Sequence, residues 1–335
     1  MKKYVVLIFP VLALFSSCID EPETKPDTYE GNFEALWNII DNKYCYLDYK
    51  NINWDSVYTV YKSQIDTSMT QTDFFNLMGN MLAELKDGHV NLYSSFNVSR
   101  YWKWFEDYPA NFSSTVVYNE NYLGDDYSIA GGMRYKKIHG NVGYIYYGDF
   151  SSYFSDSNIR YIFQSFSDCE GLILDVRNNG GGYLDQSQLL ASYFFENDTI
   201  SGYMSYKTGS GHSDFSELKP VKTSAHKSIK WQRKVVVLAN RKSFSATNNF
   251  VCQIKMAPQA IVIGDKSGGG GGLPLSSEIP NGWMVRFSAC PMYDADKQHI
   301  EWGIEPDIKV DMDLDQMSKG IDSIIEKAIE LINQK

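Results

Sequence analysis

The chain has 335 residues, a formal net charge of −10, and a globular composition rich in tyrosine (24) and phenylalanine (18). This length is sufficient for a large core and a smaller accessory domain. The acidic charge and the absence of any Lys/Arg-rich run argue against nucleic acid as a partner, because phosphates require basic patches.

The first 17 residues predict an export signal. Lys2 and Lys3 give the N-terminus a positive charge, and an apolar run follows over residues 4–15. This run is too short to span a bilayer. Two serines then precede Cys18, an arrangement that resembles a bacterial lipobox, although Phe15 stands where leucine is usual. The resemblance implies that Cys18 is lipidated and tethers the protein to a membrane surface without a spanning helix. A plain secretory signal or an uncleaved anchor is the alternative.

Residues 18–30 have no apolar periodicity and predict a flexible tether. Their acidic start, directly after Cys18, resembles the surface-export signal of Bacteroidota lipoproteins. We therefore expect an exported protein that is anchored in the cell envelope, at the periplasmic or the surface face of the outer membrane.

Residues 31–98 predict a helical module. Thr72 or Asp73 is the expected cap of its later helix, and Gly88 is the expected end, so that His89 follows directly. The apolar residues that recur with helical spacing are Phe33, Leu36, Trp37, Ile40 and Tyr44 in one segment and Phe74, Leu77, Met78, Met81, Leu82 and Leu85 in another.

The remaining chain divides into two parts. Residues 99–137 are rich in aromatic and turn residues and predict a connecting segment of short strands and loops. Residues 138–335 alternate strand and helix patterns, so they predict an α/β core. The expected elements are strands at 144–147, 172–176, 235–238 and 260–263, helices near 185–195 and 246–255, an exposed insertion or hairpin over 201–230, a hairpin turn at 280–282, and a C-terminal helix.

The most informative motif lies where the strand 235–238 ends and the next helix begins. The chain breaks at Asn240 and places Ser245 directly before the helix. A serine in this position presents its hydroxyl at the sheet edge, and the free N–H groups of the first helical turn can stabilise an oxyanion. Serine is also a common helix cap, so this motif alone does not establish a nucleophile.

Three further segments, 85–89, 175–182 and 301–307, accompany this motif. Together and in this order, the four segments resemble the tail-specific (C-terminal processing) serine protease family, which includes the tricorn protease core and the interphotoreceptor retinoid-binding modules. The resemblance spans residues 32–310 and implies a crotonase/Clp-protease-like spiral of β-β-α units. Many members carry a PDZ domain near residues 95–140, but this interval is too short, so we expect the PDZ domain to be absent.

The resemblance implies that Ser245 is the nucleophile, with Ser243 as a turn or cap residue. Many relatives use a lysine base, but the corresponding position here is Gly270. Lys266 lies nearby and matches a different position of those relatives. A Ser/Lys dyad is therefore disfavoured.

The tricorn-like branch uses histidine instead, and His89 matches that histidine. An imidazole accepts a proton at neutral pH without large tuning of its pKa. Glu301 matches the glutamate that orients the histidine in this branch. A serine relays that contact there, but Gly88 stands at this place, so Glu301 would reach His89 directly, through water, or not at all. Glu301 as a solvated hairpin carboxylate, and Asp87 as the orienting group, are the alternatives.

The oxyanion would be bound by the N–H of Ala246 and by a glycine N–H, with Gly182 the first choice and Gly181 the second. Glycine suits this role because no Cβ blocks a close approach of substrate. Neither of the two glycine runs, 180–182 and 268–272, has the Gly-Lys-Ser/Thr ending of a phosphate-binding loop. No HExxH motif or clustered ligand set indicates a metal. We expect no cofactor. The widely spaced Cys45, Cys169, Cys252 and Cys290 are expected to be buried free thiols.

The sequence thus predicts a serine endopeptidase that acts on exported proteins or peptides through an acyl-enzyme. Ser245 is the expected nucleophile, His89 the base and Glu301 the orienting residue. The main alternative is a non-catalytic peptide-, glycan- or lipid-binding protein on the same scaffold. An acyl-transfer or CoA-using enzyme would rest on the shared fold alone.

Overall fold

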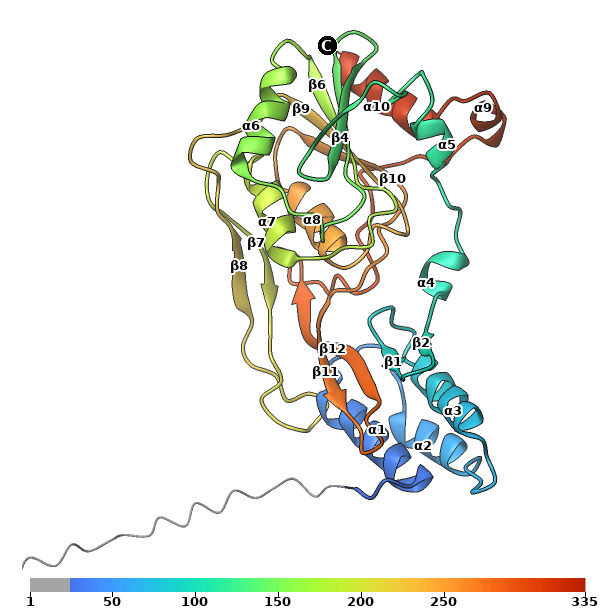
Figure 1. The fold of residues 1–335 in the computed structure, drawn as a ribbon. Coiled ribbons are helices and arrows are strands. Elements are labelled where there is room, and N and C mark those ends of the chain that lie inside the picture. Colours follow the sequence, from blue (N-terminus) through green and yellow to red (C-terminus); the bar gives the residue numbers. More distant parts are fainter. Residues whose placement is uncertain (1–24, 335) are drawn as a thin grey trace, which may run out of the picture.

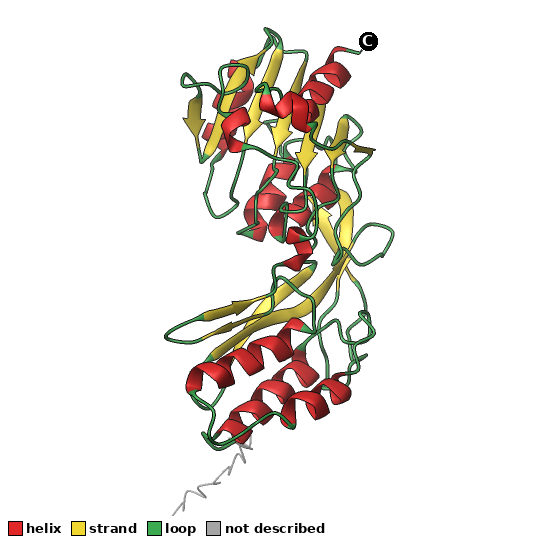
Figure 2. Cartoon of the chain, turned by 90° about the vertical axis from the view of Figure 1, so that its right-hand side faces the viewer, coloured by secondary structure: helices red, strands yellow, loops and turns green. Residues whose placement is uncertain are grey.

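A computed structural model describes residues 25–334, which form two lobes (Figure 1). One lobe holds the larger sheet and the C-terminal end of the chain, and the other holds three helices against a long β-hairpin (Figure 2). The expected signal segment, Cys18 and the first part of the tether lie outside the described residues.

The upper lobe in Figure 1 contains a seven-stranded sheet with the order β13-β10-β9-β6-β5-β4-β3. Strands β5, β6, β9, β10 and β13 run parallel to one another, and β4 and β3 are antiparallel. Every residue of the central β6 is buried, as expected of a strand that is covered on both faces. The strands are β3 (Ser128–Ala130), β4 (Met133–Ile138), β5 (Val142–Tyr146), β6 (Gly171–Asp175), β9 (Lys234–Ala239), β10 (Ala260–Gly264) and β13 (Ile308–Lys309).

Helices cover both faces of this sheet. Val235 and Val237 of β9 pack in one apolar cluster with α6, α7 and α8, whereas Val236 packs in another with α5 and α10. This alternation follows from the two-residue period of a strand. The helices are α5 (Ser114–Val117), α6 (Asp156–Ser165), α7 (Leu184–Ser192), α8 (Ala246–Ile254), α9 (Leu314–Ser318) and α10 (Ser323–Asn333).

A second sheet, with the order β2-β1-β12-β7-β8 and with β11 paired to β12, links the lobes. Its longest strand, β12, pairs with β11 over Met284–Pro291, with β1 over Met284–Arg286 and with β7 at Met292 and Tyr293. The strands are β1 (Asn91–Tyr93), β2 (Val98–Arg100), β7 (Thr199–Met204), β8 (Lys219–Thr223), β11 (Gly272–Glu278) and β12 (Met284–Tyr293).

The lower lobe packs α1 (Tyr29–Lys43), α2 (Trp54–Lys62) and α3 (Gln71–Ala83) against the β11–β12 hairpin, and the short α4 (Lys103–Glu106) follows β2. Phe33 of α1 and Phe74 of α3 share an apolar cluster with Val285 of β12. The N-cap of α3 is Thr70, which forms a capping box with Asp73.

The predicted α/β class and N-terminal helices are confirmed, but some boundaries differ. The cap of α3 lies two residues before the earlier of the two expected positions. The helix ends at Ala83 and not at Gly88, because turns occupy residues 84–89. The sheet of the upper lobe also includes β3 and β4, which lie in the segment that was expected to be a connection or at its border.

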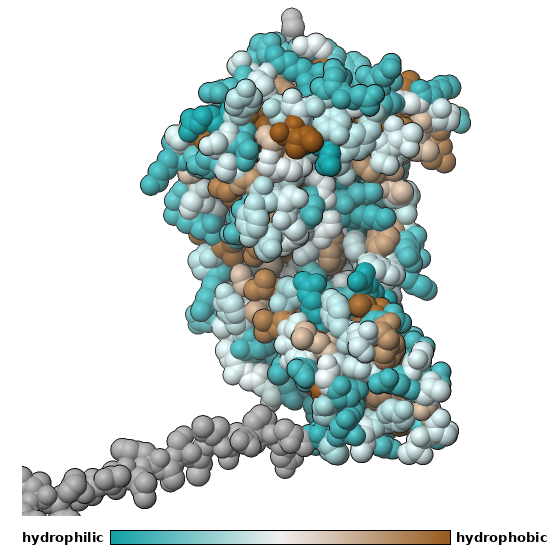
Figure 3. All heavy atoms as spheres, viewed as in Figure 1, coloured by the Kyte–Doolittle hydropathy of each residue, from teal (hydrophilic) through white to brown (hydrophobic). Residues whose placement is uncertain are grey.

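The face drawn in Figure 3 is mostly hydrophilic, with scattered hydrophobic residues. Large apolar side chains that are exposed come from distant parts of the chain, such as Val60, Tyr161 and Leu314. In the part of the chain that the structure describes, no helix is both long enough and apolar enough to cross a bilayer. The four cysteines of this part are buried and unpaired.

Candidate active site

Ser245 and His89 meet where the two lobes join. Ser245 lies between β9 and α8 of the upper lobe, and His89 lies between α3 and β1 of the lower lobe. The Nε2 atom of His89 is 2.9 Å from the Oγ atom of Ser245, although the residues are 156 positions apart. The fold therefore brings together the two residues that were expected from the sequence to be the base and the nucleophile.

The backbone at Ser245 is in an uncommon conformation, with φ 59° and ψ −119°. A residue other than glycine with positive φ costs about 1–3 kcal/mol, which the surrounding structure must offset. The N–H of Ser245 donates to the carbonyl of Gly269 at 2.9 Å. Ser243 supports the turn, since its hydroxyl donates to the carbonyl of Val176. The strand, turn and helix thus hold Ser245 at a sharp corner of the chain.

Two backbone N–H groups beside Ser245 are available to an oxyanion. Within residues 25–334, neither the N–H of Ala246 nor that of Gly182 donates to an acceptor. The N–H of Gly181, in contrast, is engaged by the side chain of Asn179 at 3.0 Å. The geometry therefore favours Gly182 over Gly181 as the second donor.

Both glycines are required by space and by backbone conformation. A Cβ at Gly181 would lie 2.8 Å from the Cβ of Ser245, and one at Gly182 would lie 2.3 Å from the N atom of Ser151. Their φ values of 99° and 139° also exclude ordinary L-residues. Gly181 thus approaches the Ser245 turn, and Gly182 approaches Phe150 and Ser151, more closely than a side chain would permit.

The ring of His89 is buried, with only 2% of the residue exposed. It packs against Phe244, on which Trp104 of α4 is stacked. This burial lowers the pKa of His89 to about 4, although Asp87 opposes the shift. His89 is therefore neutral at pH 7 and able to accept a proton at Nε2.

Of the three possibilities left open for Glu301 and His89, the structure shows no direct contact. The Oε1 atom of Glu301 is 2.6 Å from the ammonium of Lys50, and its Oε2 atom accepts from the N–H of Gly271. Among the described residues, the Nδ1 atom of His89 has no hydrogen-bond partner. Glu301 is also 96% buried, so its alternative reading as a solvated hairpin carboxylate is wrong.

Asp87 holds His89 through the main chain. Its Oδ1 atom accepts from the N–H of His89, and its Oδ2 atom accepts from the hydroxyls of Tyr44 and Ser288. The ammonium of Lys50 lies 3.6 Å from Oδ2. Burial by itself would raise the pKa of Asp87, but Lys50 and these donors hold it below its usual value.

Lys50 thus lies between two buried carboxylates, and sequence reasoning did not identify it. Its side chain is 2% exposed and its ammonium faces the ring of Trp302 at 4.7 Å. Burial and the neighbouring Asp87 raise the pKa of Glu301 to about 7, against the opposite effect of Lys50. Lys50 stands in a loop between α1 and α2 that matches no motif, so only its position in the fold shows its role.

Gly270 explains why no lysine is present at this position. A Cβ there would lie 2.6 Å from the ring of Phe244 and 3.1 Å from the Cε1 atom of His89. A longer side chain would therefore compete with the histidine ring for the same space. Lys266 forms an ion pair with Glu305 at 2.9 Å and has no contact with Ser245.

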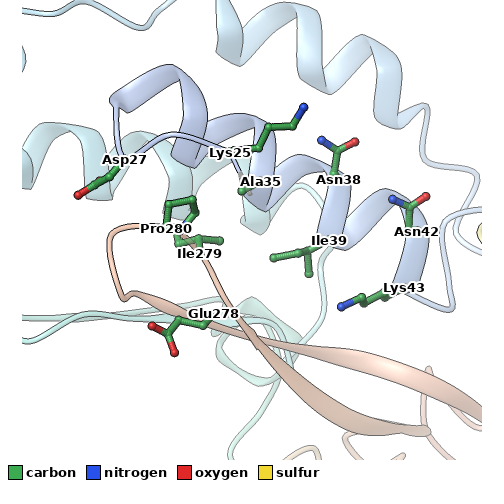
Figure 4. Close-up of a pocket in the computed structure, with 10 residues that line it drawn as sticks. All are labelled: Lys25, Asp27, Ala35, Asn38, Ile39, Asn42, Lys43, Glu278, Ile279 and Pro280. Atoms are coloured by element: carbon green, nitrogen blue, oxygen red, sulfur yellow. The ribbon is translucent and has the colours of Figure 1, made fainter. Parts of the chain in front are cut away.

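A cavity of about 210 Å³ lies beside Ser245. A larger groove of about 870 Å³ lies between α1 and the β11–β12 turn, and none of the predicted site residues lines it (Figure 4). The smaller cavity is the one that a bound substrate could share with Ser245. It is lined by Gly182, Tyr183, Leu184, Ser245, Ala246, Asn249, Gly270, Gly272, Leu273, Pro274, Arg286, Met292 and Ile300.

The arrangement suits nucleophilic catalysis by a serine with a histidine base. A hydroxyl is a weak nucleophile until a positioned base removes its proton, and the developing oxyanion needs donors at fixed positions. Among residues 25–334, no three His, Cys, Asp or Glu side chains form a group that could hold a metal ion. The chain itself supplies the nucleophile, the base and the oxyanion donors that acyl transfer requires. It does not supply a partner for the Nδ1 atom of His89 among the described residues.

Two sequence profiles match this chain. The profile of peptidase family S41 matches residues 141–310, and that of the tricorn protease C1 domain matches residues 25–83. A probable CtpA-like serine protease from Staphylococcus epidermidis is 30% identical over 180 residues, which are 53% of this chain and 35% of that protein. The chain therefore matches about a third of the length of this curated relative.

Solved structures extend the similarity over nearly the whole chain. A candidate peptidase from Parabacteroides merdae is 50% identical, covers 92% of this chain and 98% of its own, and superposes with a TM-score of 0.89. The tricorn protease superposes with a TM-score of 0.59 over 91% of this chain and 36% of its own. At 16% identity, the latter likeness concerns the fold alone.

Proposed function

Because this chain belongs to peptidase family S41, the tail-specific protease family, we propose that it is a serine endopeptidase that cleaves exported proteins or peptides. The observation that carries this proposal is the 2.9 Å contact between the Nε2 atom of His89 and the Oγ atom of Ser245. A binding protein has no need of a buried neutral imidazole against a serine in a strained turn.

In the proposed reaction, Nε2 of His89 takes the hydroxyl proton as Oγ of Ser245 attacks the peptide carbonyl. The N–H groups of Ala246 and Gly182 donate to the oxyanion of the tetrahedral intermediate. His89 then gives its proton to the leaving amine, and an acyl-enzyme remains. Water, deprotonated by His89, attacks this ester and releases the acid, which restores Ser245.

We assign to Glu301 a positioning role and not a direct contact with His89. Glu301 binds Lys50, Lys50 neutralises Asp87, and Asp87 accepts the main-chain N–H of His89. Glu301 also accepts the N–H of Gly271, in the loop whose carbonyl at Gly269 accepts from Ser245. One buried carboxylate thus supports the backbone on both sides of the reacting pair.

A second candidate function is peptide binding without catalysis. It is favoured by one observation, the missing partner of the Nδ1 atom of His89 among the described residues. A triad uses this contact to fix the tautomer and to stabilise the imidazolium. Without it, proton transfer to His89 is less favourable.

Labelling with a fluorophosphonate serine probe separates the two functions. The wild-type chain from residue 19 is compared with Ser245→Ala and His89→Ala, and circular dichroism verifies that all three are folded. The peptidase predicts labelling that both substitutions abolish. A folded wild type that stays unlabelled at millimolar probe would contradict it and favour the binding protein.

We also propose that Cys18 carries a lipid that anchors the protein in the cell envelope, with the exported substrates on the same side. Two serines before Cys18 and the acidic residues after it support this proposal. Mass spectrometry of the N-terminal peptide should show a diacylglyceryl mass on Cys18, and Cys18→Ala should release the protein from the membrane fraction. An unmodified Cys18 in membrane-bound protein would contradict it.

A further inference from the structure

We propose that the cavity beside Ser245 binds a carboxylate of the substrate through Arg286 and Asn249. The inference rests on the proposed function and deepens it, since it names peptides that carry a carboxylate near the scissile bond as the substrate class. Such a carboxylate belongs to an acidic side chain or to the C-terminus of a polypeptide.

Arg286 is a charged residue whose charge has no partner in the structure. It lies on β12 and lines the cavity together with Ser245. Within residues 25–334 its guanidinium forms no hydrogen bond or ion pair and remains partly exposed, so its donors are available to a ligand. A planar guanidinium matches a carboxylate with two parallel hydrogen bonds.

The register of β12 explains why this arginine faces the site. Arg286 and Ser288 are two residues apart, so they lie on the same face of the strand. Ser288 donates to the Oδ2 atom of Asp87, which places this face against the His89 side of the active site. The positive charge of Arg286 is close enough to His89 to contribute to the lowering of its pKa.

Asn249 contributes an unpaired donor to the same cavity. It lies one helical turn after Ser245 on α8, and its N–H donates to the carbonyl of Ser245 at 3.0 Å. Asn249 is 94% buried, and its Nδ2 atom has no hydrogen-bond partner among the described residues. A buried donor that lacks a partner costs about 1–3 kcal/mol, and a bound carboxylate oxygen would remove this cost.

The other residues that line the cavity strengthen its interaction with a charged group and favour a negative charge. Leu184, Leu273, Met292 and Ile300 provide apolar surface, and no acidic residue is among the lining residues that the structure describes. Coulomb interactions gain strength where water is excluded. The cavity therefore favours an acidic group and disfavours the ammonium of a lysine.

The test measures peptide binding and does not depend on cleavage. The chain from residue 19 with Ser245→Ala is immobilised and incubated with a synthetic library of random decapeptides. One form of the library has free C-terminal carboxylates and the other has C-terminal amides. Mass spectrometry reads the retained peptides, and fluorophosphonate labelling of the wild type is measured separately.

We expect peptides with Asp, Glu or a free C-terminus to be enriched about ten- to hundred-fold, the range of a charge-assisted hydrogen bond. Arg286→Gln in the same background should remove this enrichment. Arg134→Gln, a partly exposed arginine on β4 that also forms no ion pair within residues 25–334, is the matched control and should retain it. Arg286→Glu should instead enrich peptides with Lys or Arg, a gain that misfolding cannot produce.

The arms of the library distinguish the two sources of the carboxylate. Enrichment of acidic side chains in both forms identifies a side-chain carboxylate, and enrichment of the free-acid form alone identifies a C-terminus. Equal retention of neutral and acidic peptides, no retention at all, or enrichment that survives Arg286→Gln would overturn the inference. A wild type that escapes fluorophosphonate labelling but enriches acidic peptides would defeat the peptidase and leave this site standing.

Discussion

The two sides of the active site are held by different forces. On the Ser245 side, main-chain hydrogen bonds and close glycine contacts fix a strained turn between β9 and α8. On the His89 side, a buried set of charges made of Lys50, Asp87 and Glu301 fixes the end of the lower lobe. The comparison shows that a backbone can hold a nucleophile locally, whereas the base also depends on Lys50 and Glu301, which are far from His89 in the sequence.

The largest predicted effect is a loss of stability on the His89 side of the active site. Lys50→Met removes the only cation between Asp87 and Glu301 among the described residues. Removing one partner of a buried ion pair costs about 3–5 kcal/mol, because the remaining charge is buried and uncompensated. Urea denaturation should show this loss in the free energy of unfolding.

Lys62→Met is the control for this change, since Lys62 pairs with Glu34 at a partly exposed position. It should change the free energy of unfolding by no more than about 1 kcal/mol. Equal effects of the two substitutions would mean that the buried charges do not support the lower lobe.

The next effect depends on pH. Glu301 has its pKa raised to about 7 by burial, so its ionisation destabilises the fold as pH rises from 4.5 through 7. His89, with its pKa lowered to about 4, contributes with the opposite sign, because stability is lost as pH falls from 6.5 through 4. In the wild type these two contributions largely cancel between about pH 4.5 and 6.5.

Glu301→Gln removes one of the two contributions. The free energy of unfolding of the wild type relative to this variant should fall by about 3 kcal/mol as pH rises from 4.5 to 7. Urea denaturation at four pH values measures this difference. A difference that is constant with pH would show that Glu301 titrates normally and that the buried charges are arranged otherwise.

On the Ser245 side, Gly181→Ala should reduce the rate of fluorophosphonate labelling by about 100-fold or more. The added Cβ would lie 2.7 Å from the carbonyl oxygen of Phe244 and 3.0 Å from the N atom of Ala246. The contact would displace the N–H of Ala246, which is one of the two proposed oxyanion donors. Displacing one such donor costs about 100- to 1,000-fold in rate. Gly180→Ala is the matched control, because nothing lies within 4 Å of its Cβ, and it should label within about two-fold of the wild type.

The smallest predicted effect is on the pH profile of labelling. Because burial keeps His89 neutral down to about pH 4, the labelling rate should change by less than about two-fold between pH 7 and pH 5. A histidine with an ordinary pKa of about 6.5 would lose most of its rate over this interval. An acidic limb near pH 6.5 would show that the ring is better solvated than its packing indicates.

The same contrast decides what the sequence could predict. The place of Ser245 between a strand and a helix was predictable because strand, turn and helix are local patterns of about a dozen residues, whereas its role as nucleophile was implied by the family resemblance. The strands and amphipathic helices followed from their periods, and the glycine run from its motif. The ends of α3 were less predictable, since turns after Ala83 continue the apolar pattern as far as Leu85.

Lys50 and Arg286 were less predictable for a physical reason. Each lies far in the sequence from the residues that it faces in the fold, and a single lysine or arginine carries no local signature of its partner. Glu301 lies at the site, and of the three possibilities left open for its contact with His89 the direct contact is not made, because its two oxygens face Lys50 and Gly271. Long-range charge pairing is set by the assembled fold and leaves no periodic pattern in the chain.

The apolar cluster that unites α1 and α3 with β12 also sets the order in which the molecule can fold. Phe33 and Phe74 belong to the first quarter of the chain, but they share this cluster with Val285, which lies more than 200 residues later. The lobe that comes first in the chain is therefore completed late, because its helices cannot bury their apolar faces without the later strand. Since β12 also carries Ser288, which donates to Asp87, His89 is held against Ser245 only after β12 has joined this lobe.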